Sequence, residues 1–122
     1  MDNVVLVVDD DRDIRDSVVE LLVEHGYHAV GAANGREALA ALDTAEALPC
    51  LILLDLMMPV MDGLEFRAEQ LKNAAWARIP VVVISAYGNV DAQARELAVD
   101  HMRKPIGMRS LIDKVRRYCP GP

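Results

Sequence analysis

Residues 4–11 read Val-Val-Leu-Val-Val-Asp-Asp-Asp, a short apolar run that stops abruptly at three aspartates. A continuous, β-branched run of this length is typical of a strand that is covered on both faces, as strands in a parallel sheet usually are. Comparable runs, the last of them weaker, lie at residues 27–33, 50–54, 79–84 and 99–103. The sequence therefore predicts five strands, and the fourth includes Pro80, which is tolerated near a strand start.

Helical patterns separate these runs. A first helix ends near His25-Gly26, where the glycine is a natural stop, and Asn34 and Asp62 are expected to cap the second and third helices. A fourth helix is predicted over about residues 90–98. We expect the inner face of the third helix to carry Leu64, Ala68, Leu71 and Ala75, and that of the last helix to carry Met108, Leu111, Ile112, Val115 and Cys119.

Five strands alternating with five helices predict an α/β fold with right-handed crossovers. We expect a single domain over residues 1–122, built as a doubly wound five-stranded parallel sheet. This is the flavodoxin-like (βα)5 arrangement, with strand order 2-1-3-4-5. The length and the 52% content of hydrophobic residues fit one compact core, and no internal repeat or linker is visible.

Charge and composition exclude several classes of protein. The net charge of −6 disfavours direct binding to nucleic acid or to anionic lipid. No apolar run reaches the roughly 18 residues of a membrane span, and residues 1–3 do not resemble the start of a signal peptide. We therefore expect a cytoplasmic protein.

The two cysteines, Cys50 and Cys119, are far apart and lack the further Cys or His ligands of a structural zinc site. We expect both to be small, buried or half-buried thiols in a reducing compartment.

Polar residues fall where the predicted strands end. Asp9, Asp10 and Asp11 follow the first strand, Asp55 ends the third, Ser85 ends the fourth and Lys104 follows the fifth. The carboxyl ends of parallel strands line one crevice, which is where open α/β sheets bind ligands. Each residue alone is more often structural, and Asp11 is expected to cap the first helix. Their occurrence at successive strand ends favours a functional site.

The residue types indicate which chemistry this site performs. Crowded carboxylates repel one another unless a cation neutralises them, and oxygen ligands with open positions favour Mg²⁺ with retained waters. Lysine adds a second positive charge, and serine adds a hydrogen-bond donor. A carboxylate nucleophile, a metal and donors for an anion are the parts that phosphoryl transfer to an aspartate requires.

At these residues the sequence resembles the response-regulator receiver family of two-component signalling systems, along essentially its whole length. The most specific match is Leu-Leu-Asp-Leu-Met-Met-Pro-Val-Met-Asp-Gly at 53–63. Three shorter segments follow the family's order: Leu-Val-Val-Asp-Asp-Asp at 6–11, Ile-Ser-Ala-Tyr-Gly at 84–88 and Lys-Pro at 104–105.

The resemblance implies a role for each matching residue. Asp55 would be the phosphoacceptor. Mg²⁺ would be bound directly by Asp10, Asp55 and the backbone carbonyl of Met57, and largely through water by Asp9. The phosphoryl oxygens would meet Lys104, the hydroxyl of Ser85 and the backbone amides of Leu56 and Ala86. The Lys104–Pro105 bond would be cis, and Pro59 and Gly63 would shape the loop after the acceptor strand, the glycine by a conformation costly to other residues.

The resemblance also implies the partners. The phosphodonor would be a sensor histidine kinase or a histidine phosphotransfer protein, and the receiver of the signal a downstream protein or a fused output domain. The chain would be a monomer or a phosphorylation-dependent dimer. On phosphorylation, Ser85 would move toward the new anion, and the fourth helix, fifth strand and last helix would change as a surface. Only its own phosphorylation and dephosphorylation would be catalysed, so the chain would not be an enzyme in the turnover sense.

Two departures from the family affect the predicted signalling surface. The aromatic switch position, three residues before the lysine, holds His101, which we expect to be a surface histidine with altered partner contacts; a pH-sensitive switch is the alternative. The spacing from Ser85 to Lys104 is a few residues shorter than usual, and Ala98-Val99 replace the usual Gly-Ala.

Three other functions compete. A phosphatase with an aspartyl-phosphate intermediate would carry a second acid where this chain has Met57. A flavodoxin-like electron carrier would need a phosphate cradle where this chain has three aspartates. A receiver-like module that binds proteins without phosphorylation is the remaining alternative, and the complete set of site residues disfavours it.

Overall fold

The computed structural model describes residues 3–85 and 99–120, and five strands within them form one parallel sheet. The strands are β1 (Val4–Val8), β2 (His28–Ala32), β3 (Leu51–Asp55), β4 (Val81–Ser85) and β5 (Asp100–Arg103). Their order is β2-β1-β3-β4-β5, and every neighbouring pair is parallel. The predicted fold class and strand order are confirmed, with strand bounds within two residues of the expected ones.

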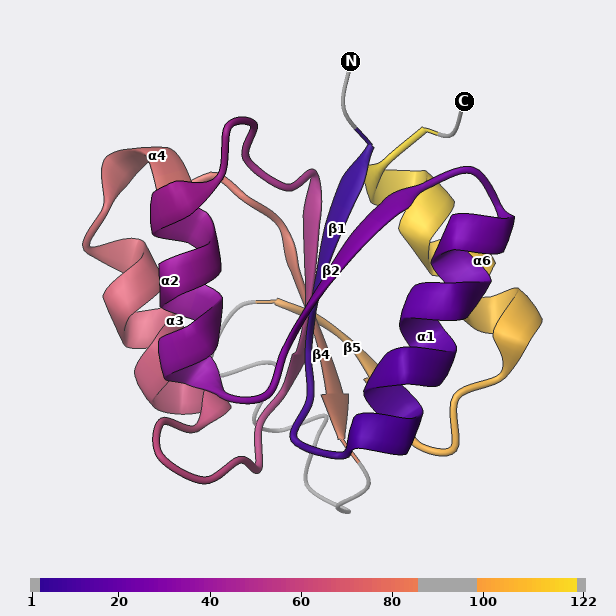
Figure 1. Ribbon diagram of the computed structural model, residues 1–122, viewed down its shortest axis with the longest axis horizontal. Helices are drawn as coiled ribbons and strands as arrows, with labels where there is room; N and C mark the ends of the chain where they lie inside the picture. The colour runs from indigo at the N-terminus through magenta and orange to yellow at the C-terminus, as the bar shows by residue number, and fades with distance from the viewer. Residues whose placement is uncertain (1–2, 86–98, 121–122) are drawn as a thin grey trace.

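Helices cover both faces of the sheet (Figure 1). On one side lie α1 (Arg12–Glu24) and α6 (Met108–Tyr118), and on the other α2 (Gly35–Thr44), α3 (Gly63–Leu71) and the short α4 (Ala74–Ala77). The helix expected at 90–98 falls outside the described residues. Among the helices that are described, none is long and apolar enough to cross a membrane.

The three residues predicted to cap helices, Asp11, Asn34 and Asp62, are the N-caps of α1, α2 and α3. The Asp11 carboxylate accepts hydrogen bonds from the amides of Asp13 and Ile14, and Asn34 caps α2 in the same way. Asp62 and Glu65 form a reciprocal capping box at the start of α3. These bonds satisfy amides that have no partner within their own helix.

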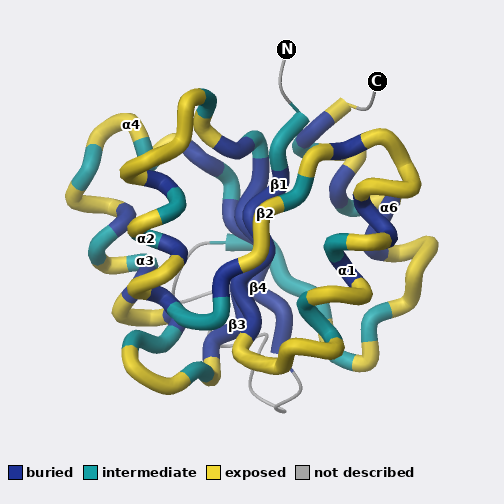
Figure 2. The backbone as a smooth tube through the Cα atoms, in the orientation of Figure 1, coloured by how far each residue is buried: buried dark blue, intermediate teal, exposed yellow. Residues whose placement is uncertain are grey.

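The core consists of two layers, one on each side of the sheet. Side chains alternate along β1, so Val5 and Val7 pack with α1 and α6, whereas Leu6 and Val8 pack with α2 and α3. All residues of β3 and β4 are buried, whereas the edge strand β2 is largely exposed (Figure 2). Burial on both faces explains why the central strands are continuous apolar runs.

The predicted inner face of α3 is wrong. Its buried residues are Gly63, Phe66 and Gln70, whereas Leu64 and Leu71 are 43% and 52% exposed. A polar residue occupies a core position because the Gln70 amide nitrogen donates to the carbonyls of Trp76 and Ile79, at 2.8 and 3.2 Å. The helix also ends sooner than expected, since α4 begins separately under an Asn73 cap.

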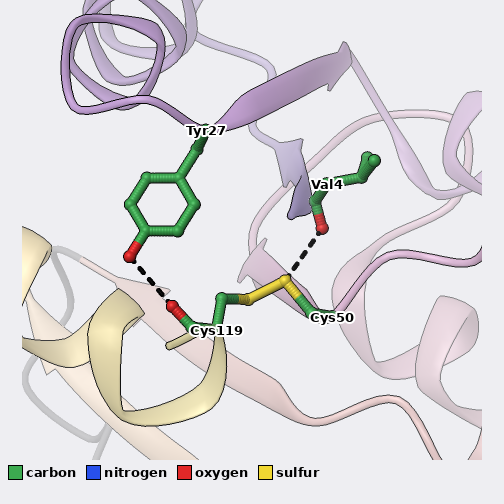
Figure 3. The surroundings of a disulfide bond; sticks show 4 residues. All are labelled: Val4, Tyr27, Cys50 and Cys119. Carbon is green, nitrogen blue, oxygen red and sulfur yellow. Dashed lines mark hydrogen bonds between the residues drawn. A yellow bond between two sulfur atoms is a disulfide. The ribbon is translucent and has the colours of Figure 1, made fainter. Parts of the chain in front are cut away.

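The expectation of free thiols is also wrong, because Cys50 and Cys119 form a disulfide bond (Figure 3). Cys50 directly precedes β3, and Cys119 caps the C-terminal end of α6. The two residues are 69 positions apart in the chain, yet their Cα atoms lie 5.7 Å apart, within the usual range for a disulfide. Only the fold brings the cysteines together, so their spacing in the sequence did not reveal the bond.

The register of α3 can be tested by replacing Gln70 with Leu. The substitution keeps the side chain's approximate size but removes the side-chain donor to the buried Ile79 carbonyl and the acceptor of the Arg67 guanidinium, so we expect the free energy of unfolding to fall by about 2–3 kcal/mol. The matched control is Leu71→Ala on the exposed side, which should cost less than about 1 kcal/mol. Urea unfolding of both variants measures these losses, and a larger loss for Leu71→Ala would contradict the observed register.

Candidate functional site

Three carboxylates meet at the ends of β1 and β3. These neighbouring strands pair Val8 with Leu54, so the residues that follow, Asp9 and Asp55, lie side by side. Together with Asp10 they offer carboxylate oxygens that all lie within 4.8 Å of one another. Asp9 and Asp55 are each only 5% exposed, whereas Asp10 is open to solvent. Strand pairing therefore gathers the acids that the sequence predicted to meet.

Lys104 places an ammonium group between the two buried acids. Its nitrogen lies 2.9 Å from Oδ2 of Asp9 and 3.2 Å from Oδ2 of Asp55. The backbone amide of Lys104 donates to the Ser85 carbonyl at 3.0 Å, which extends the pairing of β5 with β4 by one residue. The next peptide bond, Lys104–Pro105, is cis. The ion pair thus joins the ends of three strands.

The pKa values of Asp55 and Lys104 are both raised above their ordinary values. Burial is the largest influence on Asp55 and raises its pKa to about 6, the Asp9 charge adding to the rise and Lys104 opposing it. Burial by itself lowers the pKa of Lys104, but the hydrogen bond to Asp9 and the charges of Asp55 and Asp9 outweigh it, so the pKa is raised. Lys104 is therefore fully charged at neutral pH, and Asp55 is mostly ionised.

Backbone groups fix the orientation of both buried acids. Oδ1 of Asp9 accepts from the amide of Asp11 at 2.9 Å, and Oδ1 of Asp55 accepts from the amide of Met57 at 3.2 Å. The guanidinium of Arg15 donates to the Asp9 carbonyl at 2.8 Å. Sequence reasoning missed Arg15, which supports the loop after β1 from the first turn of α1. A cation at that position of a helix carries no distinctive signal.

Gly63 allows the loop after β3 to lie close to the backbone of Asp55 and Leu56. A Cβ at this residue would lie 2.7 Å from the Asp55 carbonyl oxygen and 2.8 Å from the Leu56 Cα, and its amide donates to the Leu56 carbonyl at 3.0 Å. The expected unusual conformation lies elsewhere: Val60, next to Pro59, has a φ of 67°, a region that β-branched residues rarely adopt. The loop after β3 thus packs directly against the backbone of Asp55.

Ser85 lies on β4, beside the strand of Asp55, and His101 lies on β5, one strand farther away. Ser85 ends β4, is 1% exposed, and pairs with Arg103 across to β5. His101 lies within β5 opposite Val83, with its side chain partly buried. Leu56 is buried directly after Asp55, whereas Ala86 lies outside the described residues. Ser85 is therefore at the same edge of the sheet as the acids. His101 precedes Arg103 by two residues in β5 and so lies farther from that edge.

A second polar cluster, which the sequence did not reveal, links β5 to α6. The Asp100 carboxylate accepts from the ammonium of Lys114 at 3.1 Å and from the hydroxyl of Tyr118 at 2.8 Å. Burial raises the pKa of Asp100, but these bonds and that of the His101 amide outweigh it, so the pKa is lowered. Lys114 of α6 therefore serves as a partner for Asp100.

The acidic cluster fits a hard divalent cation. Three carboxylates and one ammonium leave two uncompensated negative charges, which a divalent ion would neutralise. Lys104 already pairs with one oxygen of Asp9 and one of Asp55, while Asp10 is exposed. All the ligand atoms are oxygens, and they are few, which suits Mg²⁺ with retained waters.

The raised pKa of Asp55 predicts a pH-dependent gain in stability for Asp55→Asn in metal-free buffer. Because the folded pKa lies above 3.8, ionising Asp55 costs stability; the cost grows from pH 3.8 to about 6 and is complete above that. We expect the free energy of unfolding of the variant, measured by urea unfolding, to exceed that of the wild type by about 3 kcal/mol above pH 6, with no gain below pH 3.8. The same difference in the free energy of unfolding at every pH would contradict a raised pKa for Asp55.

Comparisons with known proteins identify the family of this chain. A family model described as the response regulator receiver domain matches residues 5–116. Sporulation initiation phosphotransferase F of Bacillus subtilis is 35% identical, and the match covers 98% of this chain and 96% of that protein. Response regulator RR06 of Streptococcus pneumoniae is 36% identical over 93% of this chain, which spans 54% of that relative.

Solved structures give the same result. The chemotaxis protein CheY4 of Vibrio cholerae superposes with a TM-score of 0.86 at 28% identity, covering 97% of this chain and 99% of that one. A response regulator receiver protein from Pseudomonas putida gives a TM-score of 0.87 at 28% identity, covering 96% and 98%. With the matching residues at the strand ends, these likenesses show that the chain belongs to the response regulator receiver domain family.

Proposed function

We propose that this chain is a signalling switch that accepts a phosphoryl group on Asp55 from a histidine kinase or a histidine phosphotransfer protein. The observation that carries the proposal is the Lys104 ammonium, held 2.9 Å from Asp9 and 3.2 Å from Asp55 at the edge of the sheet. It supplies a fixed positive charge beside the carboxylate that would become an acyl phosphate. A relative 35% identical over nearly its whole length is named a phosphotransferase.

Asp55 is the nucleophile in this proposal. With a pKa of about 6 it is mostly ionised at neutral pH, and its carboxylate oxygen attacks phosphorus as the phosphorus–nitrogen bond of the donor phosphohistidine breaks. The electron pair of that bond stays on the imidazole. Lys104 then pairs with the oxygens of the new phosphoryl group, while the buried Ser85 at the next strand end donates its hydroxyl to them.

Mg²⁺ bound by Asp10, Asp55 and the Met57 carbonyl, and through water by Asp9, would neutralise charge that builds up during transfer. Fixed backbone contacts reduce the cost of reorganisation at Asp55 and Asp9. The chain acts once on itself for each phosphoryl group, so it is a switch and not an enzyme in the turnover sense.

The signal would leave through β5 and α6. Lys104 directly follows β5, and the Asp100 carboxylate near the start of that strand binds Lys114 and Tyr118 of α6. A shift of Lys104 and Ser85 toward the phosphoryl group would therefore pull on β5, and Asp100 would pass the displacement to α6. His101 follows Asp100 in β5 and stands where the family has an aromatic residue. This difference would alter how the displacement passes from β5 to α6. The target is a downstream protein or an output domain.

The proposal is tested by incubating the protein with acetyl phosphate and measuring its intact mass, with Mg²⁺ and with a chelator. We expect the mass of one phosphoryl group to be added only with Mg²⁺, and no gain for Asp55→Ala under either condition. Asp10→Asn is the metal-site variant, and it should need more Mg²⁺ for the same gain.

A gain that persists in Asp55→Ala would contradict Asp55 as the acceptor. No gain in any sample, for a protein that remains folded, would instead favour the alternative, a receiver-like module that binds its partners without phosphorylation.

A further inference from the structure

We propose that Cys50 and Cys119 form a reversible thiol–disulfide modification site that locks the C-terminal end of α6 to the start of β3. The bond joins a residue at the entrance of the central sheet to the residue that caps the last helix (Figure 3). It lies at the end of β3 opposite to Asp55, so it is separate from the acidic site. This inference does not depend on phosphorylation.

The reduced state is also accommodated by the structure, which is why we infer reversibility. The sulfur of Cys50 lies 3.3 Å from the Val4 carbonyl oxygen, so a thiol there has an acceptor already in place. Cys119 belongs to the hydrophobic core between the sheet, α1 and α6, where a thiol behaves as a small apolar group. Breaking the bond therefore leaves the Cys50 thiol beside an acceptor and the Cys119 thiol in apolar surroundings that suit it.

The fold does not need the bond to form a core. Small domains depend on disulfides when they cannot bury enough apolar surface, whereas this chain packs two hydrophobic clusters, one on each face of its sheet. A disulfide in such a domain is free to serve as a switch. The end of α6 stays anchored without it, because the Tyr27 hydroxyl donates to the Cys119 carbonyl at 2.9 Å.

The exposure of the two cysteine residues sets the order of the exchange. Cys50 is partly exposed, whereas Cys119 is 1% exposed. On oxidation by a small disulfide such as glutathione disulfide, the Cys50 thiolate attacks one glutathione sulfur and releases one glutathione thiolate. The Cys119 thiolate then attacks the Cys50 sulfur and releases the second. The protons from both cysteines end on the two glutathione molecules, and reduction by glutathione reverses these steps.

The modification would change the freedom of the last turn of α6. In that turn the Cys119 amide donates to the Val115 carbonyl at 2.7 Å, and Tyr118 donates to Asp100 of β5. With the bond closed, this turn is tied to β3 as well as to β5. With the bond open, it is held by hydrogen bonds and packing, so it should open locally more often.

The first part of the test measures the bond itself. The native protein is equilibrated with glutathione disulfide or with reduced glutathione. It is then treated with iodoacetamide, and its intact mass is measured by mass spectrometry. Because the chain has only two cysteines, the result is unambiguous. We expect an unlabelled monomer lighter by two hydrogens after oxidation, and a doubly labelled protein after reduction and brief unfolding. Two free thiols after oxidation, or a disulfide-linked dimer, would overturn the proposal, and so would a bond that glutathione cannot reduce in the folded protein.

The second part measures the lock by hydrogen exchange of the amides at residues 115–119. We expect exchange to be roughly tenfold or more faster in reduced protein than in oxidised protein, with a melting temperature lower by roughly 5–15 °C. The matched control is Cys50→Ser, whose hydroxyl can still donate to Val4 but cannot be oxidised. It should exchange like the reduced protein under both conditions. Equal hydrogen-exchange rates at residues 115–119 in the oxidised and reduced proteins would overturn the proposal that the disulfide bond locks the end of α6.

Discussion

The Lys104 ammonium, shared between the carboxylates of Asp9 and Asp55, is the interaction on which the site depends. Two nearly buried carboxylates on neighbouring strands repel each other, and burial without a counter-charge would drive one of them to take up a proton. The ammonium lowers the pKa of Asp55, but burial outweighs it and the pKa still rises to about 6. It also connects the end of β5 to β1 and β3. In the proposed mechanism a change of charge at Asp55 would therefore act on β5, and phosphoryl transfer and signalling would share this ion pair.

Most of the fold followed from the sequence because its signals are local. Continuous apolar runs marked the strands, and Asp11, Asn34 and Asp62 marked the helix starts that their side chains now cap. The meeting of Asp9, Asp10, Asp55 and Lys104 also followed, since parallel strands bring their carboxyl ends to one edge. The ligand and phosphoacceptor roles of these residues remain proposals.

What the sequence did not reveal depends on contacts between distant segments. Gln70 looks like a surface residue until the carbonyls of Trp76 and Ile79 are placed around its amide. The resemblance singled out Gly63, but the reason for the glycine, the close approach of the backbone of Asp55 and Leu56, depends on packing between distant segments. Cys50 and Cys119 are 69 positions apart and are brought together only by the fold, so the sequence does not predict their disulfide bond. Likewise, the partnership of Asp100 with Lys114 and Tyr118 requires the packing of α6 against β5.

The central claim is that Asp55, and not Asp9 or Asp10 beside it, takes the phosphoryl group. The most direct measurement is to phosphorylate the protein, reduce the acyl phosphate with borohydride, and locate the modified residue by tandem mass spectrometry of its peptides. Reduction converts a phosphorylated aspartate to homoserine, so each of the three acids gives a distinguishable product. We expect homoserine at position 55 and unmodified aspartate at positions 9 and 10. Homoserine at position 9 or 10, with Asp55 unchanged, would contradict this claim.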